Sequence, residues 1–187
     1  MAKKHKKLTG KILIAQPFMD DNNFKRSVVG ITEHREDGTV GFILNKPVKL
    51  ELSELVAQIK TDEKFKLYYG GPVATDTIHY IHDKGDLLDD SVEVAKGIFW
   101  GGSFEKLIFL IESGLIHRHH IRFYIGYSGW SEGQLQDEMD AGSWIMSDWY
   151  ANYSFKSKSK DLWSQTLDHK GDTYSVIAKI PNNAIKN

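Results

Sequence analysis

The sequence contains no cysteine, which excludes several kinds of site before any pattern is considered. The protein cannot form disulfides, Cys-ligated zinc sites, iron–sulfur clusters or a thiol nucleophile. A chain of 187 residues buries enough surface to fold without such cross-links. The absence of cysteine also suits a reducing compartment, and we expect a cytoplasmic protein.

The sequence also lacks an excess of one charge and a long apolar run. Lysine and arginine number 24 against 25 acidic residues, which gives a net charge of −1. General nucleic-acid binders are basic, and no helix-turn-helix pattern is present, so we expect no direct nucleic-acid binding. The apolar run at residues 12–15 is too short for a signal-peptide core or a membrane span, and we expect no membrane partner.

The first nine residues differ in composition from the rest of the chain. Lys3, Lys4, Lys6 and Lys7 make this segment basic, and it has few apolar residues. Terminal segments of this kind are commonly disordered. We therefore predict a disordered basic tail over residues 1–9 and a single domain over residues 10–187.

Short runs rich in β-branched and aromatic residues indicate strands along most of the chain. Residues 27–34 and 39–45 flank Asp37-Gly38, a dipeptide typical of β-hairpin turns. Gly70-Gly71-Pro72 is predicted to form a turn between two further strands. The other predicted strands cover residues 10–18, 66–69, 77–82, 91–100, 121–127 and 143–149.

Apolar spacing and end signals predict the helices. Residues 50–60 place apolar side chains at i, i+3, i+4 and i+7, the pattern of an amphipathic helix. Ser103 is suited to cap a second helix that ends at Gly114. Ser131 and Gln134 match the capping box of a third helix, which Gly142 would close. Residues 151–160 are predicted to be a surface loop, 161–170 a short helix, and 172–180 either a helix or a strand.

The order of these elements indicates the fold class. Strands come in adjacent pairs, and helices interrupt them without strict alternation. This order favours an α+β fold with a mixed, mostly antiparallel sheet and surrounding helices over a doubly wound α/β fold.

Known catalytic and phosphate-binding motifs are not matched. Residues 126–130 (GYSGW) are similar to a nucleophile elbow around Ser128, but Trp130 stands where the motif requires glycine. Neither a P-loop nor a dinucleotide-binding glycine pattern is present. We therefore assign no catalytic residue and no cofactor, and we interpret residues 126–130 as a tight turn between a strand and a helix.

Eight histidines raise the question of a metal site. His79 and His82 are three residues apart, which places them on opposite faces of a strand. His117, His119 and His120 cluster in a predicted connection, without the carboxylates or spacing of a known metal motif. We therefore predict no metal site.

His34 is the candidate for acid–base chemistry. It follows Glu33 at a strand end, and a carboxylate within reach would let it act as a general base. A hydrogen-bonded histidine that stabilises the strand end is the alternative reading. Asn45 ends the partner strand, although Pro47 by itself is enough to explain that end.

Several short segments occur together in one order along the chain. They are 10–15 with Pro17 and Asp20, Phe24 with 27–29, Glu33-His34, 41–47, 70–73, 126–130 with Gln134-Leu135, and Ser143-Trp144. This combination resembles the YqgE/AlgH family of bacterial proteins over residues 10–150, and residues 181–187 are similar too. The sequence departs from the family at Asp21-Asn22-Asn23, where members often have a proline.

The resemblance implies a single α+β domain with a bifurcated sheet folded into a partial barrel, in the bacterial cytoplasm. It implies no chemistry, because the family has no established enzymatic activity. Some members are named as transcriptional regulators, and that name is of genetic origin.

Three functions stay open from the sequence. The leading hypothesis is a non-enzymatic binding or regulatory module for a small ligand or a protein, with its site at a rim of strand ends. The second is a hydrolase or transferase that uses His34 with Glu33, Asp20 or Asp21. The third is a transcription factor. The speculative rim consists of His34, Asn45, Gly70, Gly71, Tyr127 and Trp130, and each of these also has a purely structural explanation.

Overall fold

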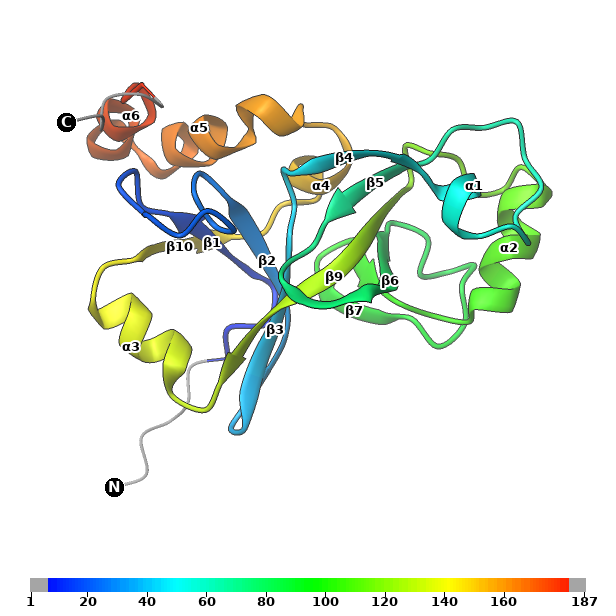
Figure 1. Ribbon diagram of the computed structural model, residues 1–187, viewed down its shortest axis with the longest axis horizontal. Coiled ribbons are helices and arrows are strands. Elements are labelled where there is room, and N and C mark those ends of the chain that lie inside the picture. Colours follow the sequence, from blue (N-terminus) through cyan, green and yellow to red (C-terminus); the bar gives the residue numbers. More distant parts are fainter. Residues whose placement is uncertain (1–6, 182–187) are drawn as a thin grey trace.

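A sheet of ten strands organises the computed structural model, which describes residues 7–181 (Figure 1). The strands are β1 (Lys11–Ala15), β2 (Val28–Arg35), β3 (Gly38–Ile43), β4 (Pro47–Glu51), β5 (Lys66–Tyr69), β6 (Val73–His82), β7 (Val92–Ala95), β8 (Ile98–Trp100), β9 (Ile121–Ser131) and β10 (Trp144–Asp148). The helices are α1 (Leu52–Leu55), α2 (Phe104–Glu112), α3 (Gln134–Asp140), α4 (Ala151–Phe155), α5 (Ser159–Lys170) and α6 (Asp172–Ala178). The predicted α+β class is confirmed, and the mainly antiparallel sheet forms a half-barrel.

The long strand β9 joins the two halves of the sheet. Its last residues pair with β3, from Gly41↔Ser128 to Gly38↔Ser131. Its first residues pair with β6 on one side and with β5 on the other, and the β5–β9 pair is parallel. The sheet therefore divides along β9, which Figure 1 shows passing between the lobe of β1, β2 and β3 and the lobe of β5, β6 and α2.

Glycine allows the two halves to approach each other where the sheet divides. Gly126 has φ +64°, and a Cβ atom there would lie 2.6 Å from the carbonyl oxygen of Gly71 and 2.8 Å from that of Val73. A Cβ atom on Gly71 would overlap the backbone of Tyr127. The Ser128 hydroxyl donates a hydrogen bond of 3.0 Å to the carbonyl of Gly70. The chain crosses itself here at backbone contact, which only residues without side chains permit.

Helices cover the two lobes and enclose three hydrophobic clusters. One cluster lies under α2 and includes Leu107, Ile111 and Phe123. A second lies between the sheet and the C-terminal helices, where the Trp163 indole donates to the carbonyl of Ala15 at 2.8 Å and fixes α5 on the end of β1. The third lies under α3. No helix within the described chain is both long and apolar enough to cross a membrane.

Most predicted strands and helices are confirmed. The tight turn predicted at residues 126–130 is wrong, because this segment belongs to strand β9. The helix predicted over residues 50–60 is not confirmed either. Only Leu52–Leu55 is helical, and Leu55 is 46 % exposed. Val56 and Ile59 are buried in the same cluster as Leu52 without continuing the helix. The apolar spacing predicted correctly that three of the four side chains are buried, but a bond from the Lys60 amide to the Glu112 carboxylate holds an irregular segment instead.

The surface loop predicted over residues 151–160 is also wrong in its first half. Residues Ala151–Phe155 form α4, and Tyr153 and Phe155 are buried in the cluster beneath it. Only Lys156–Lys158 lie outside a helix, because α5 already begins at Ser159. The lysine and serine residues near the end of the segment led to the loop prediction. The two aromatic side chains near its beginning are the ones that pack into the core.

Helix α3 was predicted, and its C-terminal end is confirmed, but it begins later than predicted. The helix begins at Gln134 after Gly133, which has φ +76°, rather than directly after Ser131. The amide of Ser131 still donates to the side chain of Gln134 at 3.1 Å, so the predicted contact forms although Ser131 ends β9. Gly142 follows the helix in a left-handed conformation, as predicted.

The predicted basic tail falls largely outside the described residues. Residues 1–6 are not described, and the Leu8 side chain is buried against the cluster under α3. The packed part of the chain therefore begins by residue 8.

The sequence left residues 172–180 open between a helix and a strand. Most of this segment is helical, because α6 covers Asp172–Ala178.

We predict that Gly126→Ala destabilises the protein by about 3 kcal/mol, because the substitution adds a backbone overlap to the cost of a left-handed alanine. Gly114→Ala is the matched control, since Gly114 has φ +68° and nothing lies within 4 Å of its Cβ position. The control should lose only about 1 kcal/mol. Urea unfolding measures both values, and equal losses would contradict the role given to the crossing.

Candidate functional site

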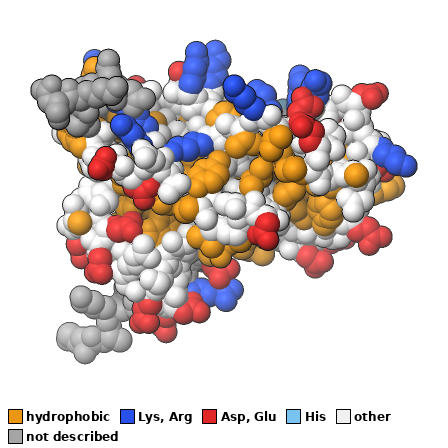
Figure 2. Space-filling model, viewed as in Figure 1, with side chains coloured by type: hydrophobic (Ala, Val, Ile, Leu, Met, Phe, Trp, Pro, Cys, Tyr) orange, Lys and Arg blue, Asp and Glu red, His pale blue; other side chains and the backbone are white. Residues whose placement is uncertain are grey.

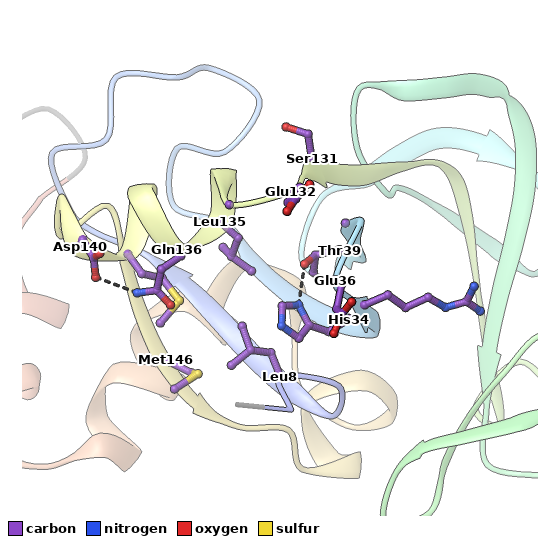
Figure 3. Close-up of a pocket in the computed structure, with 14 residues that line it drawn as sticks. Leu8, His34, Glu36, Thr39, Ser131, Glu132, Leu135, Gln136, Asp140 and Met146 are labelled. Carbon is purple, nitrogen blue, oxygen red and sulfur yellow. Dashed lines mark hydrogen bonds between the residues drawn. The ribbon is translucent and has the colours of Figure 1, made fainter. Parts of the chain in front are cut away.

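A cavity of about 730 Å³ lies between the β2–β3 hairpin, the end of β9 and helix α3 (Figure 3). Leu8, Leu135, Met139 and Met146 form its apolar wall. Its polar and charged lining consists of His34, Arg35, Glu36, Thr39, Ser131, Glu132, Gln136 and Asp140. We call this space the α3 cavity. Its combination of an apolar wall and a polar rim is typical of ligand sites.

His34 reaches the α3 cavity because of the local structure of the hairpin. The β2–β3 register shifts between Ile31 and Glu33, which is a β-bulge, and His34 then pairs with Thr39. The ring nitrogen Nδ1 of His34 lies 2.7 Å from the Thr39 hydroxyl. Figure 3 shows His34, Leu8 and Leu135 around the same space.

Helix α3 presents one polar residue pair to the cavity and one acidic residue to the core. Gln136 Nε2 donates to Asp140 Oδ1 at 2.7 Å, and both side chains line the cavity. Glu138 lies on another face, where its Oε2 accepts from the indole N–H groups of Trp130 (2.9 Å) and Trp144 (2.8 Å). One carboxylate therefore accepts the indole N–H hydrogen bonds of both tryptophans, whose rings pack edge to face.

Trp130, one of the predicted rim residues, is a core residue in this structure. Its side chain is 5 % exposed and packs with Phe24 and Leu135. It pairs with Thr39 in the β3–β9 ladder but, unlike Thr39, does not line the cavity.

Asn45 satisfies the backbone where β2 begins. Its Oδ1 accepts from the amide of Val28 and its Nδ2 donates to the carbonyl of Arg26, both at 2.9 Å. Arg26 has φ +51°, an uncommon conformation for a residue with a side chain. The Asn45 side chain therefore holds a strained corner in place and uses both its donor and its acceptor to do so.

Gly70, Gly71 and Tyr127 lie together at the crossing of the sheet. The two glycines contact the backbone of residues 126–128, and the Tyr127 ring packs edge-on against His79 at 5.9 Å between ring centroids. Burial lowers the pKa of His79. The structure thus groups the predicted rim residues at different places: His34 at the α3 cavity, these three at the crossing, Asn45 at the start of β2 and Trp130 in the core.

The carboxylates named as acid–base partners of His34 do not join it in the α3 cavity. Glu33 pairs with Arg35 at 2.7 Å and, as a neighbour in the strand, projects to the opposite face. Asp20 and Asp21 precede the start of β2, whereas His34 lies near its end, about 20 Å away along an extended strand. The acidic residues that share the cavity with His34 are Glu36, Glu132 and Asp140.

Two histidines elsewhere in the described chain show how such side chains are held. His82 is fully buried, and its Nε2 donates to the carbonyl of Gly101 at 2.9 Å while its Nδ1 accepts from the amide of Lys84 at 3.2 Å. His117 lies 3.1 Å from Glu63. Within residues 7–181, no group of three or more His, Asp or Glu side chains is placed to hold a metal ion.

Comparison with known proteins places the chain in a family. A family model described as AlgH-like matches residues 12–175. The chain belongs to the AlgH-like family. A UPF0301 protein of Chlorobaculum parvum is 43% identical over 173 residues, which cover 92% of this chain and 91% of the relative. A UPF0301 protein of Bacteroides thetaiotaomicron is 36% identical over 172 residues, covering 92% and 87% of the two chains.

Two solved structures share the fold. The solution structure of the AlgH protein from Pseudomonas aeruginosa superposes with a TM-score of 0.74 at 26% identity, over 97% of this chain and 98% of that one. A crystal structure of a protein from Corynebacterium diphtheriae gives a TM-score of 0.79 at 21% identity, over 96% and 95%. The family resemblance drawn from the sequence is thereby confirmed. The names of these AlgH-like relatives and structures state no biochemical activity.

The sequence did not indicate most of the cavity lining. Gln136 and Asp140 are four residues apart on α3, a spacing that places two side chains on one helix face and could have suggested a shared role. Leu8 was assigned to a tail, and Met146 to a strand without a stated partner. Only the fold brings these four residues to the hairpin that carries His34.

We predict that stability falls as the pH decreases below about 6.5, the pKa of an unperturbed histidine. Burial lowers the pKa of His82 in the folded state, so the unfolded chain binds a proton more readily. The stabilising contribution is therefore complete above the unfolded pKa and is lost at lower pH. Denaturant unfolding between pH 8 and pH 5 should show a weaker pH dependence in His82→Gln, which keeps a donor for Gly101; an unchanged slope would contradict this assignment.

We predict that Asn45→Ala lowers the free energy of unfolding by about 2 kcal/mol, because two backbone groups lose their partner. The control is Asn152→Ala, since Asn152 is exposed on α4 and its side chain makes no hydrogen bond within the described structure. Chemical unfolding of both variants measures the difference. If Asn45→Ala were as stable as the control variant, Asn45 would be free for a role in binding.

Proposed function

We propose that this AlgH-like protein is a non-enzymatic, cytoplasmic binding domain that takes a small ligand or a short protein segment in the α3 cavity. The observation that carries the proposal is the cavity itself, whose volume of about 730 Å³ lies within the range of small-molecule sites. A regulatory role would then follow from ligand occupancy rather than from direct DNA binding.

The lining indicates the chemistry of the ligand. The apolar wall of Leu8, Leu135, Met139 and Met146 favours an apolar body, and methionine adapts to irregular shapes. Around it, Glu36, Glu132 and Asp140 outnumber the single cation Arg35. We expect a ligand with an apolar body and a polar or cationic end, oriented by hydrogen bonds to the rim.

A binding role also agrees with the groups that surround His34. The Thr39 hydroxyl lies at 2.7 Å from its ring, and the carboxylates proposed for acid–base work are placed elsewhere. The protein has no cysteine, and Ser128, the serine nearest to a nucleophile motif, is fully buried and bonded to the carbonyl of Gly70. These observations support ligand binding over hydrolysis or group transfer at this site.

The proposal predicts that fragment screening by two-dimensional NMR finds ligands that shift the amide signals of the β2–β3 hairpin, the end of β9 and α3. Gln136→Trp should abolish those shifts, because an indole at this exposed lining position would occupy the cavity. Hydrophobic fragments with an amine or amide group are the probes of choice.

Asp137→Trp is the matched control for this experiment. Asp137 is the next residue on α3, is also exposed, and does not line the cavity. Fragments should bind this variant as they bind the native protein. Fragments that map elsewhere, or that bind both tryptophan variants equally, would refute the α3 cavity as the site.

A further inference from the structure

A second hollow, of about 790 Å³, lies between the edge formed by β4, β5 and β9 and the turn that joins α4 to α5. Six cationic residues line it, against one acidic residue, Glu51. The cationic residues are Lys64, Lys66, Arg118, Arg122, Lys158 and Lys160. We call it the cationic groove; Figure 2 shows lysine and arginine side chains gathered along the upper edge of this view, above β4–β5 and the start of α5.

Strand pairing brings these charges together from distant parts of the sequence. Lys66 pairs with Glu51 on β4, and the adjacent Leu67 pairs with Phe123 on β9, which places Arg122 beside Lys66. The end of α4 contacts β9, where the carbonyl of Phe155 accepts from Arg122 at 3.1 Å, and the α4–α5 turn that follows lines the groove.

Four of the six cations have no acidic partner within the described chain. Glu51 pairs with Lys64 at 3.3 Å, and Glu63 lies 4.0 Å from the guanidinium of Arg118. The remaining four form no ion pair with residues 7–181, and three of them are exposed lysines. They are Lys66, Arg122, Lys158 and Lys160.

Arg122 is held in a fixed position at the base of the groove. Its guanidinium donates to the carbonyls of Arg118 at 2.9 Å, Ile121 at 3.1 Å and Phe155 at 3.1 Å, and it lies over the Tyr68 ring at 5.9 Å. All of these partners are neutral. The charge is therefore oriented without being neutralised, as in sites where a planar guanidinium binds a phosphate.

The start of α5 adds to the positive potential. Lys158 is the N-cap residue, Lys160 lies in the first turn, and no side chain caps the helix. A helix N-terminus favours acidic side chains, so two lysines here raise the free energy of the folded protein. Asp161 offsets part of that cost, but it does not line the groove.

We propose that the cationic groove binds a small molecule carrying two or more linked phosphate groups. Such an anion would neutralise Lys66, Arg122, Lys158 and Lys160 together, which no single residue of the described chain does. The site is independent of the α3 cavity and uses none of its residues.

The lining favours a small phosphorylated molecule over a nucleic acid strand. Proteins that bind single strands stack bases on exposed aromatic rings. The two Phe and Tyr side chains of the groove, Phe65 and Tyr68, are 2 % and 6 % exposed. The acidic residues Glu51, Glu63 and Asp161 also border the positive charge and limit its extent.

Isothermal titration calorimetry with magnesium-free tripolyphosphate, ATP, adenosine and a 12-nucleotide single-stranded DNA tests the proposal at about 0.15 M salt. Tripolyphosphate and ATP should bind, adenosine should not, and raising the salt concentration should weaken binding. Equal affinity for tripolyphosphate and ATP would locate recognition in the phosphate chain, and tighter ATP binding would assign a nucleoside contact as well.

The variant Lys158→Glu/Lys160→Glu should weaken tripolyphosphate binding about tenfold or more. Both side chains are exposed and make no contact that the fold needs, so the variant should fold. Lys96→Glu, in the turn between β7 and β8, is the control for a charge reversal outside the groove and should bind as the native protein does. Gln136→Trp should also bind normally, which separates this test from that of the α3 cavity.

Three results would overturn the proposal. The first is an absence of tripolyphosphate and ATP binding at this salt concentration. The second is an equal loss of affinity in Lys96→Glu, which would indicate attraction by overall charge alone. The third is binding of the DNA strand more tightly than ATP with the same sensitivity to Lys158→Glu/Lys160→Glu, which would assign the groove to nucleic acid.

Discussion

The contact between residues 70–71 and 126–128 is the constraint on which the rest of the structure depends. Two backbone segments meet there without an intervening side chain, and the Ser128 hydroxyl closes the contact on the carbonyl of Gly70. Because Gly126 has a left-handed conformation, β9 can leave its ladder with β5 and β6 and pair with β3 instead. Without that change of partner the chain would form two separate sheets rather than a divided one.

Sharing β9 between the two halves also positions both candidate sites. The strand begins beside Arg122 at the cationic groove and ends with Ser131 at the α3 cavity, about 30 Å further along an extended chain. Each site then takes its second wall from a helical segment, α3 in one case and the α4–α5 turn in the other. The core between them is well packed, so the two sites are separate recognition surfaces on one rigid support.

The sequence predicts a helix or strand well where nearby residues determine it. It predicts the candidate sites poorly, because contacts between distant residues determine where those sites form. Asp37-Gly38 and the apolar runs beside it were enough to predict the β2–β3 hairpin, and Ser103 was enough to predict the start of α2. By contrast, no sequence pattern around Trp130 indicates that its indole N–H donates a hydrogen bond to Glu138 on helix α3. Asn45 was similarly read as a site residue, whereas its amide holds a backbone corner 17 and 19 residues away.

The cationic groove shows why the net charge of the chain does not predict the charge of a local site. A net charge of −1 is a sum over the whole chain, but charges on a surface act over roughly one Debye length, about 8–10 Å in physiological salt. The lining of the groove has six cations and one carboxylate, and the lining of the α3 cavity has three acidic residues and one arginine. A neutral chain can therefore present one positive and one negative hollow, because strand pairing and helix placement determine which charges become neighbours. The near-zero total argues against a uniformly basic nucleic-acid binder, and it has no bearing on a local site for a compact anion.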